Sequence, residues 1–77
     1  MPKHDDDFLR WFGSRLREIR HKKGLSQEEL AELAGIDRTY VGGVERGERN
    51  LSLLNVKRIS DALGINVKDL FDNDFKL

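Results

Sequence analysis

The segment from residue 26 to residue 46 constrains the fold of this 77-residue chain more than any other. It holds two short runs of apolar residues at helical spacing, and each run follows a side chain that can cap a helix, Ser26 and Asp37. Gly35 stands between the runs, where a tight turn needs a residue that accepts a positive φ. Ala31 is small enough for a second helix to approach. The segment therefore predicts two helices packed at a steep angle. The residues expected to be buried in this unit are Leu30, Ala34, Ile36, Val41 and Val44.

Helix-start and helix-stop signals divide the remaining chain into further short helices. The first helix is expected over residues 7–23, with Gly24 after its end. Ser26 and Glu29 form a capping-box pattern at the start of the second helix, and Leu33 is expected to turn inward with Leu30. The third helix is expected over residues 38–46, before Gly47. The apolar stripe expected along the first helix consists of Phe8, Phe12, Leu16 and Ile19.

Two more helices are expected near the end of the chain. Ser52 is the predicted cap of a fourth helix that ends at Gly64, and Asn66 is the predicted cap of a fifth helix over residues 67–71. No segment has the alternating pattern of a strand. We therefore expect an all-α, compact five-helix bundle, with residues 1–7 as a flexible segment and residues 8–77 as a single domain. The apolar residues that mark the fourth helix are Leu54, Ile59, Ala62 and Leu63.

Size and composition limit the classes of protein to consider. A chain this short, with 36% charged residues, has little core to spare, so oligomerisation is a natural source of further burial. It has no cysteine for disulfides or thiolate metal sites. No apolar run has the length of a membrane span, and the first residues lack the apolar region of a signal peptide. We expect a soluble, cytoplasmic protein of a prokaryote, associated with the nucleoid.

The charge is balanced overall but unevenly distributed. Fourteen basic residues match fourteen acidic ones, which by itself argues against a nucleic-acid partner. However, residues 8–23 carry a net charge of +5 and residues 38–58 a net charge of +3, whereas residues 24–37 carry −4. Charge runs are often only solvated helix faces. Beside the pattern of residues 26–46, the local excess favours a surface that attracts DNA.

Cap, inward leucine, small alanine, turn glycine, second cap and two inward valines fall in one register between residues 26 and 46. In this the chain resembles helix-turn-helix domains of the Cro and phage-repressor type, the XRE family, over residues 16–71. The resemblance includes the phrases Glu45-Arg46-Gly47 and Ala62-Leu63-Gly64-Ile65. Residues 37–50 are similar to controller proteins of restriction–modification systems. The resemblance implies a lambda-repressor-like fold whose third helix enters the major groove of double-stranded DNA.

The resemblance also assigns roles to individual positions of the third helix. Its first turn would face base edges, where Arg38 can bond to guanine O6 and N7, and Thr39 and Tyr40 offer hydroxyls. Arg38 could instead bind only phosphate, and Tyr40 could only pack. Gly42 and Gly43 are unusual inside a helix, where each costs about 0.8–1 kcal/mol relative to alanine. Close approach to DNA or to another part of the protein would explain them. The positions expected at the bases are Arg38, Thr39, Tyr40 and Gly43, the last without a side chain of its own.

The family pattern further implies which residues hold the DNA backbone and which hold the fold. Arg20 and Glu45 are expected to form a partly buried, structural ion pair. The last helix and the tail are expected to form the interface of a homodimer. The residues expected to bind phosphate are Gln27, Arg46, Arg49, Asn50 and Ser52. The residues expected at the dimer interface are Ile65, Val67, Leu70, Phe71 and Phe75.

No set of nucleophile, base and orienting group is recognisable, so we do not expect an enzyme. No cofactor, small-molecule ligand or membrane partner is expected either. No metal site is expected, because His4 and the three aspartates after it lie at a chain end, where side chains lack the converging geometry that a metal needs. We expect a homodimeric, sequence-specific transcriptional regulator on a palindromic operator, with the controller of a restriction–modification system as one form. RNA polymerase is a further candidate partner. An antitoxin, a phage-type repressor and a protein-interaction module of the same fold that has lost DNA binding remain as alternatives.

Overall fold

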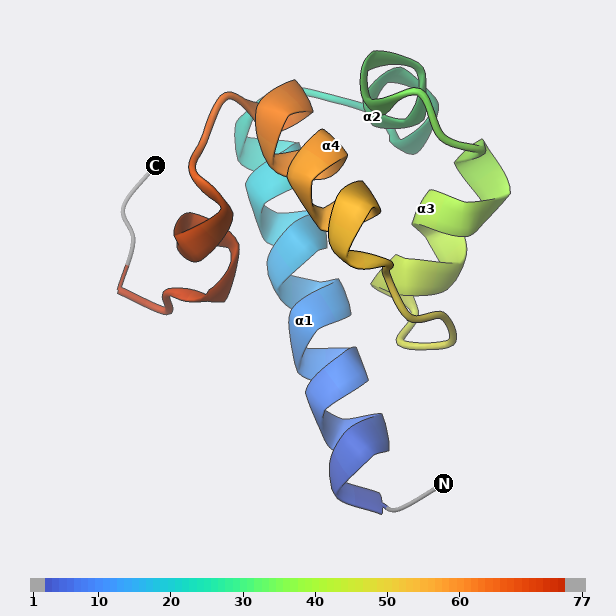
Figure 1. Cartoon of the computed structure of the whole chain (residues 1–77), viewed down its shortest axis with the longest axis vertical. Coiled ribbons are helices and arrows are strands. Elements are labelled where there is room, and N and C mark those ends of the chain that lie inside the picture. Colours follow the sequence, from blue (N-terminus) through green and yellow to red (C-terminus); the bar gives the residue numbers. More distant parts are fainter. Residues whose placement is uncertain (1–2, 75–77) are drawn as a thin grey trace.

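The computed structural model describes residues 3–74 of the chain, and these residues are helical without any strand. The elements are α1 (Lys3–Lys22), α2 (Gln27–Ala34), α3 (Arg38–Glu45), α4 (Leu53–Leu63) and the 3₁₀ helix η1 (Val67–Phe71). In Figure 1, α1 and α4 run side by side, with α2 and α3 on one side of them and η1 on the other. None of these helices within residues 3–74 is long and apolar enough to cross a bilayer. The expected all-α architecture is confirmed.

The expectation of five α-helices is corrected at the last element. Residues 67–71 are helical as expected, but they form a 3₁₀ helix. The segment has only five residues. The carbonyl oxygens of Asp69 and Asp72 accept hydrogen bonds from the guanidinium of Arg15, at 3.1 and 2.8 Å, and so are taken by a group outside the segment. Short runs of i→i+3 bonds are the usual outcome in such segments.

The first helix is longer at its start than expected. It begins at Lys3 rather than near Asp7, and the acidic side chains of Asp5 and Asp6 lie in its first turn, where they complement the positive end of the helix. This end of α1 extends past the other helices (Figure 1). Phe8 is therefore 53% exposed, although it belongs to the expected apolar stripe.

The caps of the helix-turn-helix unit lie where the sequence placed them. Ser26 Oγ accepts from the backbone N–H of Glu29 at 3.0 Å, and Glu29 Oε1 accepts from the backbone N–H of Ser26 at 2.8 Å. Gly35 ends α2 with a φ of 71°, in the left-handed region that favours glycine. Asp37 Oδ1 accepts from the backbone N–H of Thr39 at 2.7 Å and so caps α3. These bonds satisfy donors that a helix start leaves free.

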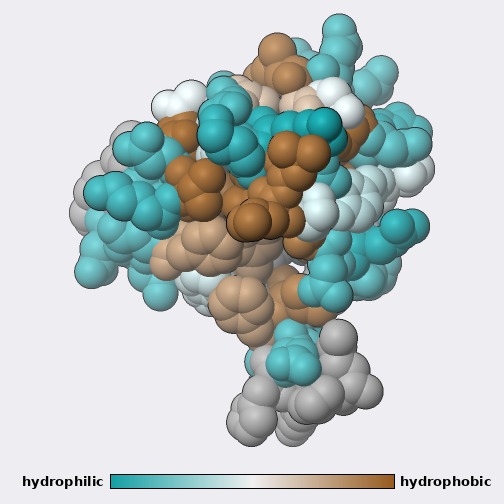
Figure 2. All heavy atoms as spheres, in the orientation of Figure 1, coloured by the Kyte–Doolittle hydropathy of each residue, from teal (hydrophilic) through white to brown (hydrophobic). Residues whose placement is uncertain are grey.

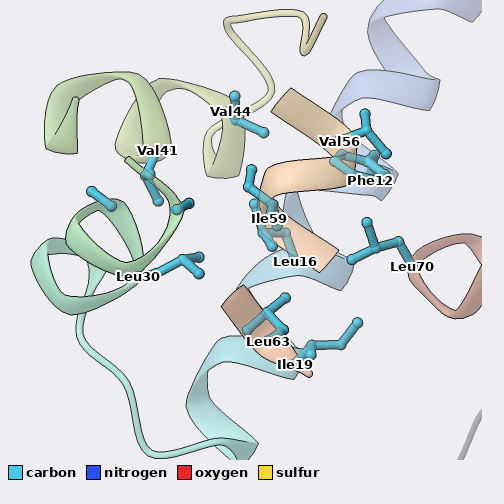
Figure 3. Packing of buried hydrophobic residues seen from close by; sticks show 12 residues of the cluster. Phe12, Leu16, Ile19, Leu30, Val41, Val44, Val56, Ile59, Leu63 and Leu70 are labelled. Atoms are coloured by element: carbon cyan, nitrogen blue, oxygen red, sulfur yellow. The ribbon is translucent and has the colours of Figure 1, made fainter. Parts of the chain in front are cut away.

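The core joins all five elements, with Leu16 of α1 and Ile59 of α4 near its centre (Figure 3). Leu33, which was expected to turn inward, is 62% exposed, and Leu54 of α4 is 58% exposed. Residues along a helix turn by about 100° each, and the buried residues of α2 and α4 define faces that leave these two leucines outside. Ile36 and Ala62 are only half-buried against the core. The buried apolar residues are Phe12, Leu16, Ile19, Leu30, Ala31, Ala34, Val41, Val44, Val56, Ile59, Leu63 and Leu70.

Gly13 sets how closely α1 and α3 approach each other, and the sequence analysis did not single it out. A Cβ at this position would lie 2.4 Å from the carbonyl oxygen of Val44 and 2.5 Å from that of Glu45. These are backbone atoms, so they cannot move aside as a side chain can. The glycine lets α1 pass directly against the end of α3, which fixes the position of the second helix of the unit.

Candidate nucleic-acid interface

The first turn of α3 presents an exposed arginine to solvent. Arg38 Nη1 lies 3.7 Å from Glu28 Oε2, and both side chains are largely exposed, so this contact is weak. Thr39 donates its hydroxyl to Asp37 Oδ1 at 2.6 Å. The hydrogen bonds from the hydroxyl and the backbone N–H of Thr39 hold the pKa of the Asp37 carboxyl below its ordinary value, so the cap is ionised at neutral pH. Arg38 is therefore available to bind, whereas the hydroxyl of Thr39 is engaged in the cap.

Tyr40 joins α3 to the loop that follows it. Its ring is half-buried, and its hydroxyl donates to the carbonyl oxygen of Asn50. The guanidinium of Arg49 lies over the ring, 5.8 Å from its centroid, at a distance typical of a cation–π contact. The phenol, which was expected at the bases, thus holds the loop and supports a second arginine.

Gly42 and Gly43 are both buried, and side chains of the same chain pack over both positions. A Cβ at Gly43 would lie 2.7 Å from Cγ of Arg49, and a Cβ at Gly42 would lie 3.3 Å from Oε1 of Gln27. The stem of Arg49 therefore crosses α3 over Gly43. The side chain of Arg49 therefore covers Gly43, which was expected to lie at the bases.

The residues expected to bind phosphate fall into two groups. Arg46, Arg49 and Asn50 are exposed, and Arg46 Nε donates to Glu48 at 3.1 Å in a surface ion pair. The other two members make bonds within the fold. Gln27 Nε2 donates to Glu45 Oε1 at 3.0 Å, and Ser52 Oγ accepts from the backbone N–H of Asn55 at 3.1 Å as the cap of α4. Ser52 is exposed as well, so four of the five residues lie exposed between the end of α3 and the start of α4, and only Gln27 is half-buried.

Arg20 and Glu45 form the expected ion pair, and it is more deeply buried than expected. Arg20 Nε donates to Glu45 Oε2 at 2.6 Å and Nη2 donates to Oε1 at 3.0 Å, with side-chain exposures of 7% and 3%. Nη1 of Arg20 also donates to the carbonyl oxygen of Leu25 at 2.7 Å. The bond to the Glu45 carboxylate raises the pKa of Arg20. The pair ties α1 to the C-terminal turn of α3, and Gln27 extends it to the start of α2.

A buried arginine that the sequence analysis missed holds η1 against α1. Arg15 donates from Nη2 to the carbonyl oxygens of Asp69 and Asp72, and from Nη1 to Glu18 at 3.0 Å. Its side chain is 7% exposed. Charged residues are mostly exposed, so a sequence pattern places an arginine at the surface by default. The pattern of apolar residues therefore could not indicate that Arg15 is buried and holds η1.

The residues expected at the dimer interface are placed unevenly. Leu70 is fully buried in the core of the chain, so it is not available to a partner, and that expectation was wrong. Its burial follows from the docking of η1 on α1. Ile65 and Val67 are half-buried, Phe71 is exposed, and Phe75 lies outside the described residues. Figure 2 shows apolar surface on the face that carries α4. The large exposed apolar residues are Phe8, Leu33, Leu53, Leu54 and Phe71.

Within the described part of the chain, no group of three or more His, Cys, Asp or Glu side chains is placed to hold a metal ion. His4, which was considered with the aspartates beside it, lies outside the described side chains.

The capped helix pair, its left-handed glycine turn and its exposed arginine define a helix-turn-helix domain. The helix-turn-helix family matches residues 16–70, and the chain belongs to this family. It is 50% identical over 62 residues to the control protein C.BamHI of Bacillus amyloliquefaciens, which spans 79% of this chain and 76% of that protein. It is 44% identical over 63 residues to the control protein C.MunI of Mycoplasma sp., which spans 80% of this chain and 85% of that protein.

Comparison with solved structures also finds controller proteins. The restriction-modification controller protein C.AhdI from Aeromonas hydrophila is 58% identical, with a TM-score of 0.83 over 84% of this chain and 98% of that chain. The structure of C.Esp1396I bound to a 19 base pair DNA duplex is 35% identical, with a TM-score of 0.75 over 82% of this chain and 84% of that chain. The chain is thus similar to controller proteins of restriction–modification systems in both sequence and structure.

Proposed function

We propose that the chain is a sequence-specific DNA-binding regulator of transcription, of the controller type found in restriction–modification systems. The observation that carries this proposal is the exposed Arg38 at the first turn of α3, on a helix whose other side is buried against α1 and α2. An N-terminal turn presented in this way can enter a major groove. The similarity to control proteins, and to one solved with a DNA duplex, supports the same assignment.

We propose further that it acts as a homodimer on a palindromic operator whose half-sites lie about one helical turn, ~34–36 Å, apart. Exposed apolar side chains on α4 and at the end of η1, Leu53, Leu54 and Phe71, are available to a second copy. Selection of bound sites from a random DNA library tests both parts, because a dimer of this kind returns inverted repeats. Return of no enriched sequence would contradict the proposal.

Arg38 and Arg49 are expected to differ in their effects on DNA binding. Arg38→Ala should cost about 1–3 kcal/mol on the selected site and relax the preference at one base position, because an arginine that bonds to a base is lost. Arg49→Ala should weaken binding to selected and scrambled duplexes alike and reduce the salt dependence, because a phosphate contact is lost. Titrations with both duplexes at several salt concentrations measure this. Equal losses on both duplexes for both variants would contradict the division into base-reading and phosphate-binding residues.

Gly43→Ala is expected to separate stability from binding. Alanine is favoured over glycine inside a helix by about 1 kcal/mol. The new Cβ would lie 2.7 Å from Cγ of Arg49, so the exposed Arg49 side chain would have to leave its place over α3 by changing its χ1 rotamer. We therefore expect an unchanged or higher free energy of unfolding together with weaker binding to duplex DNA. Wild-type affinity in this variant would show that the position of Arg49 over α3 does not matter for binding.

A further inference from the structure

A polar hollow lies beside the first turn of α3 and reaches onto α4. Its walls come from three parts of the chain: the start of α3, the loop after α3, and the first two turns of α4. The polar residues that line it are Asp37, Thr39, Tyr40, Arg49, Asn55 and Arg58. Neither Asn55 nor Arg58 belongs to the residues so far connected with DNA.

The charges around the hollow favour an anion. Arg49 and Arg58 supply two guanidiniums against the single carboxylate of Asp37, which already accepts two hydrogen bonds from Thr39. Among residues 5–74, no carboxylate lies within 4.0 Å of the charged nitrogens of Arg49 or Arg58. The two guanidiniums are therefore not neutralised by ion pairs of their own.

Arg58 is held at the hollow by its neighbour on the same helix. Its Nη1 donates to Oδ1 of Asn55 at 3.2 Å, one turn earlier in α4. Lys57, the next residue along the chain, differs from it. Its Nζ contacts both carboxylate oxygens of Asp61, at 2.7 and 2.6 Å, and it does not line the hollow. Two adjacent exposed cations on α4 thus have different surroundings.

We propose that Arg58, supported by Asn55 and together with Arg49, binds a backbone phosphate of duplex DNA, so that the contact continues from α3 and its loop onto α4. This proposal rests on the proposed function, because the phosphate belongs to the same duplex that Arg38 reads. Guanidiniums bind phosphate with directed, charge-assisted hydrogen bonds. The contact adds affinity and fixes the position of the domain without reading sequence.

The test compares Arg58→Ala with Lys57→Ala, which removes the same charge from the neighbouring position. Affinities for a selected duplex and a scrambled duplex of the same length are measured across a series of salt concentrations. Arg58→Ala should raise Kd on both duplexes by roughly fivefold to tenfold near 0.1 M salt and lower the slope of log Kd against log salt by about one. Lys57→Ala should leave the slope unchanged, and Arg58→Lys, which keeps the charge, should restore most of it.

Three results would contradict either the proposed phosphate site or the proposed function, and they can be distinguished. Equal slopes for Arg58→Ala, Lys57→Ala and wild type would remove the phosphate site while leaving DNA binding intact. A loss on the selected duplex alone would make Arg58 a base-reading residue instead. A wild-type chain that enriches no sequence from the library and binds no duplex DNA would overturn the proposed function itself. Circular dichroism melts check that the variants are folded, and because Arg58 is exposed we expect no change in Tm.

Discussion

Glu45→Ala should lower the free energy of unfolding by about 3–5 kcal/mol, since it leaves the buried guanidinium of Arg20 without its carboxylate. After the change, Arg20 keeps its bond to the carbonyl oxygen of Leu25, which carries no compensating charge. A domain of this size is stabilised by only about 5–15 kcal/mol, so a large part of the total is at stake. Urea denaturation followed by the fluorescence of Trp11 measures the loss.

Two controls separate burial from charge in this experiment. Asp61→Ala breaks the exposed pair with Lys57 and should change stability by no more than about 1 kcal/mol. The double variant Arg20→Met with Glu45→Leu removes both buried charges and should recover most of the loss, because well-packed apolar residues can replace a buried pair. A double variant as unstable as Glu45→Ala would show that packing geometry, rather than an unpaired charge, causes the destabilisation.

Gly13→Ala should destabilise the domain although alanine is the better helix former. The added Cβ would lie 2.4 and 2.5 Å from two carbonyl oxygens at the end of α3, so α1 and α3 would have to separate. Overpacking of this kind costs about 1–3 kcal/mol and occasionally more, which exceeds the roughly 1 kcal/mol gained from helix propensity. Chemical denaturation gives the net effect.

Gly43→Ala is the matched control, since it makes the same change inside another helix where only the Arg49 side chain stands in the way. We expect Gly13→Ala to lower the free energy of unfolding and Gly43→Ala to leave it unchanged or raise it. If Gly13→Ala were as stable as Gly43→Ala, the close crossing of α1 and α3 would not be limiting.

The features that could be predicted from the sequence depend on residues close together in the chain. The Ser26–Glu29 capping box, the Asp37 cap and the Gly35 turn each involve residues within six consecutive positions, so their chemistry is visible in the sequence. The expected Arg20–Glu45 pair is different, because it came from the resemblance to a family. The bonds from Arg15 to the backbone at the end of η1 could not be predicted either, because Arg15 lies 54 residues before Asp69.

Features that depend on how the helices cross could not be predicted. Leu33 and Leu54 carry the apolar character of core residues, but which face of a short helix is covered depends on its neighbours in space. The role of Gly13 could not be predicted for the same reason, since it depends on where α3 lies relative to α1. At the candidate site, Arg38 was assigned to the bases by the resemblance to a family, in which the first turn of the third helix faces the groove. The crossing of Arg49 over Gly43 could not be read from the pattern, because a loop side chain has no fixed direction.

The bonds from Arg15 to the backbone at Asp69 and Asp72 have a consequence for the geometry of the operator. They tie η1 to α1, against which α3 also packs, so in the proposed dimer an interface near Phe71 would leave little freedom to vary the span between the two α3 helices. One base pair inserted between the half-sites turns the second of them by about a tenth of a revolution. The DNA would then have to twist or bend to absorb the mismatch, and tolerance to spacer length would measure the stiffness of the duplex rather than that of the protein.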